Sequence, residues 1–422
     1  MSLTTLLALG IFVITMGLII SEKLHRTVAA LLGASLLLLL KVFSPSAALA
    51  YVDFNTLGVL MGMMIIVSIV KKTGVFEYLA IVSAKKAKGD PWRIIVFLCV
   101  VTALISSFLD NVTTVLLIVP MTFVITKKLN VEPIPFLIPE ILASNIGGTA
   151  TVIGDPPNIM IGSRAGLTFT DFIVNLGPII VVIFIALFFV LWLIYRKRLK
   201  VDDESKKKIF ELDESVCIKD KPLLYKCGGV LFLVVLGFVL HDKLGFENGL
   251  IAIAGAVLLV LVSRADIEEA LLSIEWPTIF FFASLFVLVG ALEEVGLIGS
   301  LAGLITGVMK DNLLLAGILL IWFAAIVSAF LDNIPFVATL IPLILGLGAQ
   351  GVDIAPLWWA VSLGACLGGN GTLIGASANV VVAGLAHKQG YELSFKQYLK
   401  IGFPLMALSV ALSTVYLALF YL

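Results

Sequence analysis

The sequence is poor in charged residues, and it holds few cysteines and histidines. Charged side chains make up 13% of the 422 residues, whereas soluble proteins carry about 25%. The four cysteines stand at scattered positions without paired spacing, so the sequence predicts neither a disulfide framework nor a zinc site. The three histidines are isolated near the ends of apolar segments, as expected of single interfacial side chains. We therefore expect no cofactor.

Apolar residues, in contrast, make up 60% of the chain, and its mean hydropathy is +1.14. This composition excludes an ordinary soluble enzyme, a disordered chain and a nucleic-acid-binding protein. A helix needs about 20 apolar residues to cross a bilayer, so a polytopic membrane protein is predicted. The first run lacks a basic start and a cleavage site, and we expect a spanning helix rather than a signal peptide. The runs lie near residues 3–20, 25–43, 54–71, 92–126, 134–163, 172–195, 223–241, 247–263, 276–292, 312–347, 355–386 and 398–421.

Two of these runs, 92–126 and 312–347, are too long for one crossing. At about 1.5 Å per residue, each would exceed roughly 50 Å as a single helix. Each carries an Asp-Asn pair near its middle, Asp110-Asn111 in the first and Asp332-Asn333 in the second. We expect each run to break at this pair into two arms, which form either a re-entrant hairpin or two crossings.

The chain contains an internal repeat. Ser106–Asn111 matches Ser328–Asn333 at a constant offset of 222, and Gly147–Gly154 matches Gly368–Gly375 one position out of step. Such self-similarity predicts two structural repeats joined by a segment of mixed charge, which we expect to be a solvated linker. The predicted units are a first repeat over 1–200 with a hairpin at 92–126 and a broken helix at 134–163, a linker over 201–222, and a second repeat over 223–422 with a hairpin at 312–347 and a broken helix at 355–386.

Five single spans and one hairpin give each repeat an odd number of crossings, so the second repeat is inverted relative to the first. Inverted repeats are typical of secondary transporters. Of the 28 Lys and Arg residues, 24 fall on one side of the membrane and 4 on the other. The positive-inside rule makes the first side, with the linker, cytoplasmic and places both termini outside. The predicted fold is an all-α polytopic membrane protein with about ten transmembrane helices, two re-entrant hairpins and two broken helices.

Asp110 and Asp332 occupy equivalent positions in the two inverted hairpins, whose tips can meet near the bilayer midplane. An ionisable group at that depth costs about 2.5–3.5 kcal/mol and is a functional-site hypothesis by default. Asn111 and Asn333 add carbonyl oxygens for a cation and amides for an anion, so we predict a Na⁺ site at these four residues. The alternative is that each aspartate only caps the second arm of its hairpin, and both roles can coexist.

Glycine clusters interrupt the two runs of about 30 residues that follow the hairpins. Glycine weakens a helix by about 1 kcal/mol, and unwound backbone at membrane depth occurs where it is buried or lines a cavity. The bare carbonyls and helix ends of such a break suit the binding of ions and substrate. The alternative is that the glycines allow close helix packing. The candidate residues are Asn145, Gly147, Gly148, Thr149 and Thr151 in the first repeat and Gly368, Gly369, Asn370, Gly371 and Thr372 in the second.

A Gly-Asp-Pro-Pro-Asn segment, 154–158, follows the first glycine cluster and corresponds to residues 375–379. Asp155 has no carboxylate counterpart, because Ala376 replaces it. It is either a coupling-ion ligand or proton carrier, or the cap of a short helix. The hairpin tips differ as well, and a more polar first tip is expected if one asymmetric substrate spans the site. The further candidate residues of these segments are Thr113, Thr114, Asp155, Asn158, Ser377 and Asn379.

With these motifs, carried by Phe108–Leu117, Gly154–Asn158, Asp332–Phe336 and Gly368–Val380, the chain resembles the ion transporter superfamily. This superfamily includes arsenical pump membrane proteins, sodium/proton antiporters and divalent-anion/sodium symporters. The chain is most similar to prokaryotic relatives of the melanosomal P protein (the oculocutaneous albinism type II protein). The resemblance covers nearly the whole sequence.

The resemblance implies a scaffold domain and a transport domain that moves as an elevator within a homodimer. In the anion symporters the hairpin tips read Ser-Asn-Thr, a motif that helps to bind sodium and carboxylate. Here the tips read Asp110-Asn111-Val112 and Asp332-Asn333-Ile334. The aspartates make the site more negative, which disfavours a bare dicarboxylate and favours Na⁺ or H⁺.

The predicted function is secondary active transport across the plasma membrane, coupled to Na⁺ or H⁺. The paired aspartates favour ion antiport of the Na⁺/H⁺ type. The alternative is cation-coupled transport of a small anion or oxyacid, such as arsenite, a carboxylate or chloride. An ion channel is disfavoured because hairpins entering from opposite sides would occlude a continuous path. No nucleophile–base set in the sequence suggests an enzyme.

Overall fold

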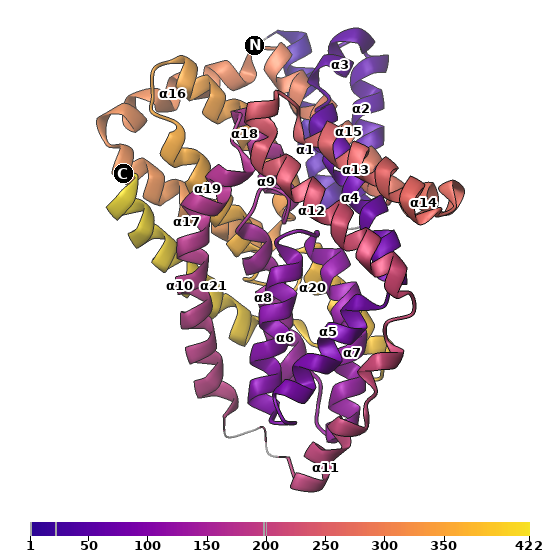
Figure 1. Ribbon diagram of the computed structural model, residues 1–422. Helices are drawn as coiled ribbons and strands as arrows, with labels where there is room; N and C mark the ends of the chain where they lie inside the picture. Colours follow the sequence, from indigo (N-terminus) through magenta and orange to yellow (C-terminus); the bar gives the residue numbers. More distant parts are fainter. Residues whose placement is uncertain (1, 22, 197–198, 200) are drawn as a thin grey trace.

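The computed structural model describes residues 2–21, 23–196, 199 and 201–422, and within this part the side chains of all residues except 305 and 307–311. All regular structure in the described part is helical, without a strand, as the sequence predicts (Figure 1). Eight of the described helices are long and apolar enough to cross a membrane: α1 (Leu3–Ser21), α4 (Phe54–Lys72), α7 (Asn111–Leu129), α10 (Phe169–Tyr195), α12 (Lys221–Leu244), α15 (Trp276–Glu294), α17 (Leu313–Phe330) and α21 (Phe395–Phe420).

Five shorter apolar helices accompany them. These are α2 (Arg26–Leu39), α6 (Pro91–Ser106), α13 (Asn248–Ser263), α18 (Asn333–Ala349) and α19 (Ala355–Gly368). The remaining α-helices are α3 (Pro45–Tyr51), α5 (Val75–Lys86), α8 (Ile134–Thr149), α9 (Pro156–Ala165), α11 (Asp203–Lys208), α14 (Ile267–Leu272), α16 (Leu297–Asp311) and α20 (Ser377–Lys388). The runs near 25–43 and 247–263, expected as full spans, form the 14-residue α2 and the 16-residue α13.

The helices begin in the register of the sequence repeat. Helices α4, α6 and α7 begin at positions 54, 91 and 111, and α15, α17 and α18 begin at positions 276, 313 and 333, which keeps the offset of the repeat throughout. Helices α8 and α9 begin at positions 134 and 156, and α19 and α20 at positions 355 and 377, where the offset is smaller by one. The slip by one position seen in the sequence therefore falls between the hairpin and the broken helix of each half.

Both long apolar runs break at their Asp-Asn pair. Helix α6 ends at Ser106, and α7 begins at Asn111 after Asp110, whose side chain accepts a hydrogen bond from the backbone N–H of Thr113 at 2.9 Å. In the second half, Asp332 precedes α18 and accepts from the N–H of Ile334 at 3.1 Å. A carboxylate that accepts from the first free N–H groups fixes the start of a helix. Both aspartates therefore cap the second arm of their hairpin, and this leaves one oxygen of each carboxylate for other partners.

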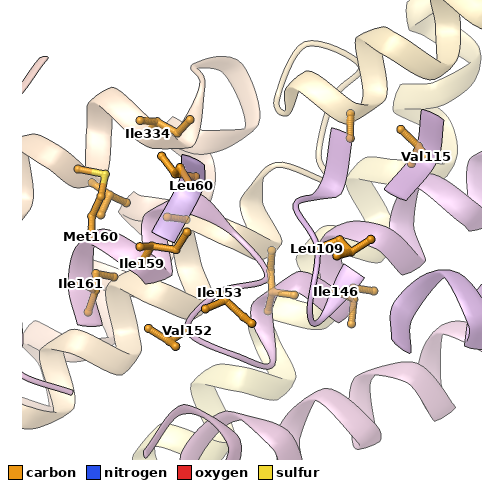
Figure 2. Close-up of a cluster of buried hydrophobic side chains, with 14 of the residues drawn as sticks. Leu60, Leu109, Val115, Ile146, Val152, Ile153, Ile159, Met160, Ile161 and Ile334 are labelled. Carbon is orange, nitrogen blue, oxygen red and sulfur yellow. The ribbon is translucent and has the colours of Figure 1, made fainter. Parts of the chain in front are cut away.

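The helices of both glycine-containing runs are discontinuous. Helices α8 and α9 are separated by residues 150–155, and α19 and α20 by residues 369–376. Figure 2 shows that Ile146, Val152, Ile153 and Ile159 gather around the first break, and each is at most 5% exposed. The unwound backbone is thus buried inside the protein, where its polar groups find partners.

Two glycines of these segments are required by close helix packing. A Cβ on Gly147 would lie 2.4 Å from the carbonyl oxygen of Ala103 in α6, and a Cβ on Gly368 would lie 2.5 Å from that of Ala325 in α17. Ala103 and Ala325 are themselves equivalent positions of the repeat. The packing alternative therefore accounts for Gly147 and Gly368, which bring the broken helix of each half against the first arm of its hairpin.

Four helices were not predicted from the sequence. Helices α3 and α14 have 7 and 6 residues, and α5 carries Glu77, Lys85 and Lys86 in its 12 residues. None of these three offers an apolar run long enough to be read as a span. The fourth, α16, lies in the equivalent place to α5, since the two helices begin at matching positions of the repeat.

The linker 201–222 is docked on the helices rather than only solvated. It contains α11 and two 3₁₀ turns, η1 (Ile209–Glu211) and η2 (Glu214–Val216). Lys85 of α5 pairs with Glu214, and Lys128 of α7 pairs with Glu211 at 3.4 Å. The Lys85 hydrogen bond holds the pKa of the Glu214 carboxyl below its usual value. Both termini lie in the upper half of Figure 1, whereas α11 lies at its lower end.

The assignment of basic residues to the two membrane faces remains a prediction. Lys197, Arg198 and Lys200, counted on the cytoplasmic side, lie outside the described residues, and so does the side chain of Lys310, counted on the other.

Substitution of Gly147 by alanine tests the packing of α8 against α6. A methyl group at 2.4 Å from a carbonyl oxygen forces the helices apart, and overpacking of this kind costs about 1–3 kcal/mol. We expect Gly147→Ala to lower the thermal unfolding midpoint of the protein in detergent. The control is Gly10→Ala in α1, where nothing lies within 4 Å of the added carbon. Equal midpoints for the two variants would contradict the packing role.

Candidate functional site

Six helix N-termini, those of α2, α7, α9, α15, α18 and α20, converge on one small pocket. It is lined by the first residues of α7, α9, α18 and α20 and by residues of α2, α4 and α15, and its volume is about 60 Å³. We call it the central pocket. Its polar lining consists of Arg26, Asp110, Asn111, Asp155, Glu275, Thr278, Asp332, Asn333 and Ser377. The tips of the two hairpins therefore meet, as their equivalence in the repeat predicts.

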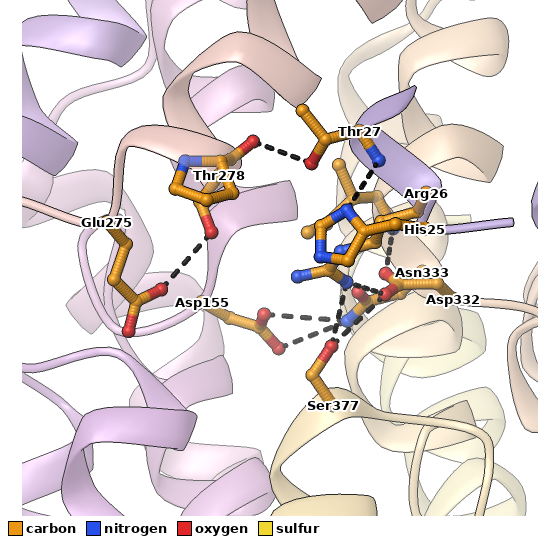
Figure 3. Close-up of polar contacts among 11 residues, drawn as sticks. His25, Arg26, Thr27, Asp155, Glu275, Thr278, Asp332, Asn333 and Ser377 are labelled. Carbon is orange, nitrogen blue, oxygen red and sulfur yellow. Dashed lines mark hydrogen bonds and ion pairs between the residues drawn. The ribbon is translucent and has the colours of Figure 1, made fainter. Parts of the chain in front are cut away.

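Arg26 closes one side of the central pocket (Figure 3). Its Nη1 donates to Asp332 Oδ2 at 2.6 Å and to Ser377 Oγ at 2.9 Å, and Ser377 Oγ donates to the same carboxylate at 3.2 Å. The guanidinium also lies over the ring of Phe281, 5.2 Å from its centroid. The side chains of Arg26 and Asp332 are 30% and 20% exposed. The pair thus joins α2 to both the second hairpin and α20.

Asp155 is the most deeply buried carboxylate of the pocket, at 2% exposure. It occupies the N-cap position of α9, but its side chain makes no capping hydrogen bond. Both of its oxygens instead accept from Nδ2 of Asn333, at 3.4 and 3.5 Å. The capping alternative for Asp155 is therefore wrong, and the carboxylate faces the tip of the second hairpin (Figure 3).

Glu275 lies at the edge of the pocket, at the N-cap position of α15, and accepts from Thr278 Oγ1 at 3.1 Å. With Asp110, Asp155 and Asp332 it makes four carboxylates around one guanidinium. If all five groups are ionised, four negative charges and one positive charge leave a formal charge of −3. The positive ends of six helix dipoles offset part of this charge. The remainder favours a bound cation or a proton.

Most of the other predicted residues form a buried hydrogen-bond network beside the pocket. Nδ2 of Asn145 donates to Oδ1 of Asn370 at 2.9 Å and of Asn379 at 3.0 Å. Nδ2 of Asn158 donates to two carbonyls of the first break, those of Thr149 and Thr151. Nδ2 of Asn379 donates to two carbonyls of the second break, those of Gly369 and Thr372. These asparagines replace the lost helical hydrogen bonds and join the two halves.

The predicted residues thus separate into two groups. Those that line the central pocket are Asp110, Asn111, Asp155, Asp332, Asn333 and Ser377. Those that do not line it are Thr113, Thr114, Asn145, Gly147, Gly148, Thr149, Thr151, Asn158, Gly368, Gly369, Asn370, Gly371, Thr372 and Asn379. Their contribution to binding stays a prediction. Most of them belong to the buried hydrogen-bond network beside the pocket.

Sequence reasoning missed three polar residues of the pocket, Arg26, Glu275 and Thr278. Arg26 was counted among the loop cations, although it lies within the apolar run near 25–43. Thr278 lies in the first turn of α15 and matches Thr56 at the offset of the repeat. This match was the sequence signal for Thr278. A further acid, Glu140, is 1% exposed in α8 and accepts from Thr122 Oγ1 at 2.7 Å. The sequence signal that could have revealed Glu140 is a single glutamate within the apolar run near 134–163.

No group of three or more histidine, cysteine, aspartate or glutamate side chains within the described part of the chain is placed to hold a metal ion. In the predicted Na⁺ site, Oδ1 of Asn111 already accepts from Ser106 Oγ at 2.6 Å. Asn333 presents its amide to Asp155. The four predicted ligands share the pocket but do not form a ready coordination shell in this conformation.

Comparison with known proteins identifies related transporters. The family model described as citrate transporter (CitMHS) matches residues 16–364. The "Uncharacterized transporter Mb2703" of Mycobacterium bovis is 44% identical over 99% of both chains. The human P protein is 37% identical over 95% of this chain and 58% of its own length, which confirms the resemblance stated from the motifs. The Alcanivorax borkumensis YdaH transporter shares the fold, with a TM-score of 0.60 at 14% identity over 99% of this chain and 98% of its own.

The Arg26–Asp332 pair is tested by a double-mutant cycle with Arg26→Gln and Asp332→Asn. Each single change leaves a partly buried polar group without its partner, so we expect the free energies of unfolding in detergent to show a coupling of about 1 kcal/mol or more. The more exposed pair Lys128–Glu211, changed to glutamine at both positions, is the control and should show almost no coupling. Additive effects of Arg26→Gln and Asp332→Asn would show that the pair is not formed.

Proposed function

We propose a specific activity for this chain, which belongs to the citrate transporter family of membrane transporters. It is a secondary active transporter coupled to Na⁺ or H⁺, and its activity is ion antiport. The observation that carries this proposal is the excess of carboxylates in the central pocket. Carboxylates that share one small pocket at membrane depth are stable only when protons, bound cations or cationic side chains balance their charge. A site that binds protons and metal cations in turn is an exchange site.

The size of the pocket supports a small substrate. Pockets that bury drug-sized organic ligands have volumes of about 300–1,000 Å³, and the central pocket has about 60 Å³. That space fits an ion with a few water molecules. In this conformation the volume therefore favours an ion over an organic substrate.

The second candidate function is cation-coupled transport of a small carboxylate or oxyacid. Two observations favour it. The N-terminus of α20 has no capping side chain, since Ala376 stands at its N-cap position, and a free helix N-terminus binds anions. Arg26 lies beside it and could exchange Asp332 for the carboxylate of a substrate. This activity would require a wider pocket than the present conformation has.

The same proposal includes the arrangement of the protein in the membrane. We propose that the hairpins and broken helices move together, as an elevator, against a scaffold built from α1–α4 and α12–α15. The scaffold would dimerise in the plasma membrane, with the linker 201–222 cytoplasmic and both termini outside. The contact of Arg26 with Asp332 at the tip of the second hairpin would then be made and broken in each cycle.

A flux assay in proteoliposomes with imposed Na⁺ and pH gradients tests the proposed function. We expect a gradient-driven exchange of Na⁺ for H⁺. The exchange rate should fall at least tenfold in Asp110→Asn and in Asp332→Asn, because each substitution removes a charge that the ion balances. The control is Glu392→Gln, which changes an exposed acid outside the central pocket.

Three results would discriminate the proposals. Flux unaffected by collapse of both gradients would contradict coupled transport. Full gradient-driven exchange in both aspartate variants would reduce these residues to helix caps. Na⁺-dependent uptake of a carboxylate in place of Na⁺/H⁺ exchange would select the second candidate function.

A further inference from the structure

A second polar cavity lies at the N-terminal ends of α4 and α13. It is also lined by the C-terminal end of α9 and by the connection between α12 and α13, and its volume is about 560 Å³. We call it the peripheral cavity. Its polar lining is Asp53, Asn55, Ser163, Arg164, His241, Asp242, Glu247 and Asn248. It shares no lining residue with the central pocket.

The internal repeat relates the two sites. At the offset of the repeat, Asp53 corresponds to Glu275, and Asn248 corresponds to Arg26. Both members of each pair stand at the start of equivalent helices, α4 and α15 for the acids, and α13 and α2 for Asn248 and Arg26. The peripheral cavity is therefore the counterpart, in the other half, of the part of the central pocket formed by α2 and α15. At the position of the Arg26 guanidinium, the peripheral cavity has the neutral side chain of Asn248.

The peripheral cavity has an excess of negative charge. Asp53, 6% exposed, is paired with Arg164 at 3.7 Å and also accepts from Ser163 Oγ at 2.9 Å. This pairing uses the one guanidinium of the lining. Asp242 and Glu247 remain exposed at the rim, and neither forms an ion pair with a described residue. Two uncompensated carboxylates attract cations and repel anions.

Asn248 supplies an unused acceptor inside this negative cavity. Its side chain is only 7% exposed, and its Oδ1 has no hydrogen-bond partner among the described residues. Nε2 of His241, in the same lining, is likewise buried without a partner in the described part of the chain. A buried carbonyl oxygen without a donor costs about 1–3 kcal/mol, and in a native protein it indicates a missing water, ion or ligand.

We propose that the peripheral cavity binds a monovalent cation, Na⁺ with part of its hydration shell, through Oδ1 of Asn248. The carboxylates of Asp242 and Glu247 raise the local cation concentration and accept from its water molecules. Ca²⁺ is disfavoured, since it takes about six to eight oxygen ligands, carboxylates among them, and the described residues hold no group of three acidic, histidine or cysteine side chains placed for a metal ion. This site is additional to the exchange site proposed in the central pocket.

Na⁺ titration of the purified full chain in detergent tests this inference. The thermal unfolding midpoint is followed as NaCl replaces choline chloride at constant ionic strength, in an Asp110→Asn/Asp332→Asn background that removes two central carboxylates. We expect a saturable rise of the midpoint with Na⁺. Asn248→Leu should weaken the apparent Na⁺ affinity at least tenfold, and Asn248→Asp should strengthen it about fivefold. A gain of affinity cannot result from misfolding.

A pair of charge variants provides the matched control. Glu247→Gln removes a rim charge without removing a helix cap, because Glu247 makes no capping hydrogen bond, and it should weaken Na⁺ binding about threefold. Glu392→Gln, exposed and outside the cavity, should leave binding unchanged.

The outcomes separate this site from the central one. An equal Na⁺ response in Asn248→Leu, in Asn248→Asp and in the Asp110→Asn/Asp332→Asn background without them would overturn the inference. A Na⁺ response present in the unmodified protein but absent from the Asp110→Asn/Asp332→Asn background would also overturn it, and would assign the ion to the central pocket. Na⁺ binding that survives in this background while its Na⁺/H⁺ exchange is lost would support both proposals.

Discussion

The crowding of four carboxylates and one guanidinium at the N-terminal ends of helices is the constraint on which the rest of this structure depends. Removing a charge from water costs several kcal/mol unless partners replace the solvent. Here the partners are the N–H groups of helix ends, the amide of Asn333 and the guanidinium of Arg26. These partners stabilise the carboxylates where the two hairpin tips meet beside Arg26 and Asp155. The negative charge that remains is the chemical basis of the cation exchange that we propose.

The two halves share a framework and differ in their charges. Asn158 and Asn379 satisfy the backbone at equivalent breaks, and Gly147 and Gly368 allow equivalent close contacts. The charged residues do not follow this symmetry, because Asp155 is matched by Ala376 and Arg26 by Asn248. The repeat therefore supplies the shape of the site, and the departures from the repeat make its two sides chemically different. An ion bound in the way that we propose would meet different partners on the two sides.

The framework was largely predictable from the sequence, because it follows from local features. Apolar runs, the Asp-Asn pairs and the glycine clusters each mark a helix or its end within a few residues. The lining of the central pocket was predicted only in part. Arg26 and Asp332 are far apart in the chain, and Arg26 stands at the very start of an apolar run, where the cations counted by the positive-inside rule also stand. Asp155 precedes a Pro-Pro helix start, so its position could not reveal that its carboxylate turns away to Asn333.

The most direct test of the account is proton release from the purified protein on addition of Na⁺. In weakly buffered detergent solution, a pH-sensitive dye reports protons that leave the carboxylates when Na⁺ replaces them. The account predicts release of about one proton per chain by NaCl, none by choline chloride, and none from a variant in which Asp110, Asp155 and Asp332 are all asparagine. No release from the unmodified protein, or equal release from the variant, would contradict the claim that the central pocket exchanges protons for cations.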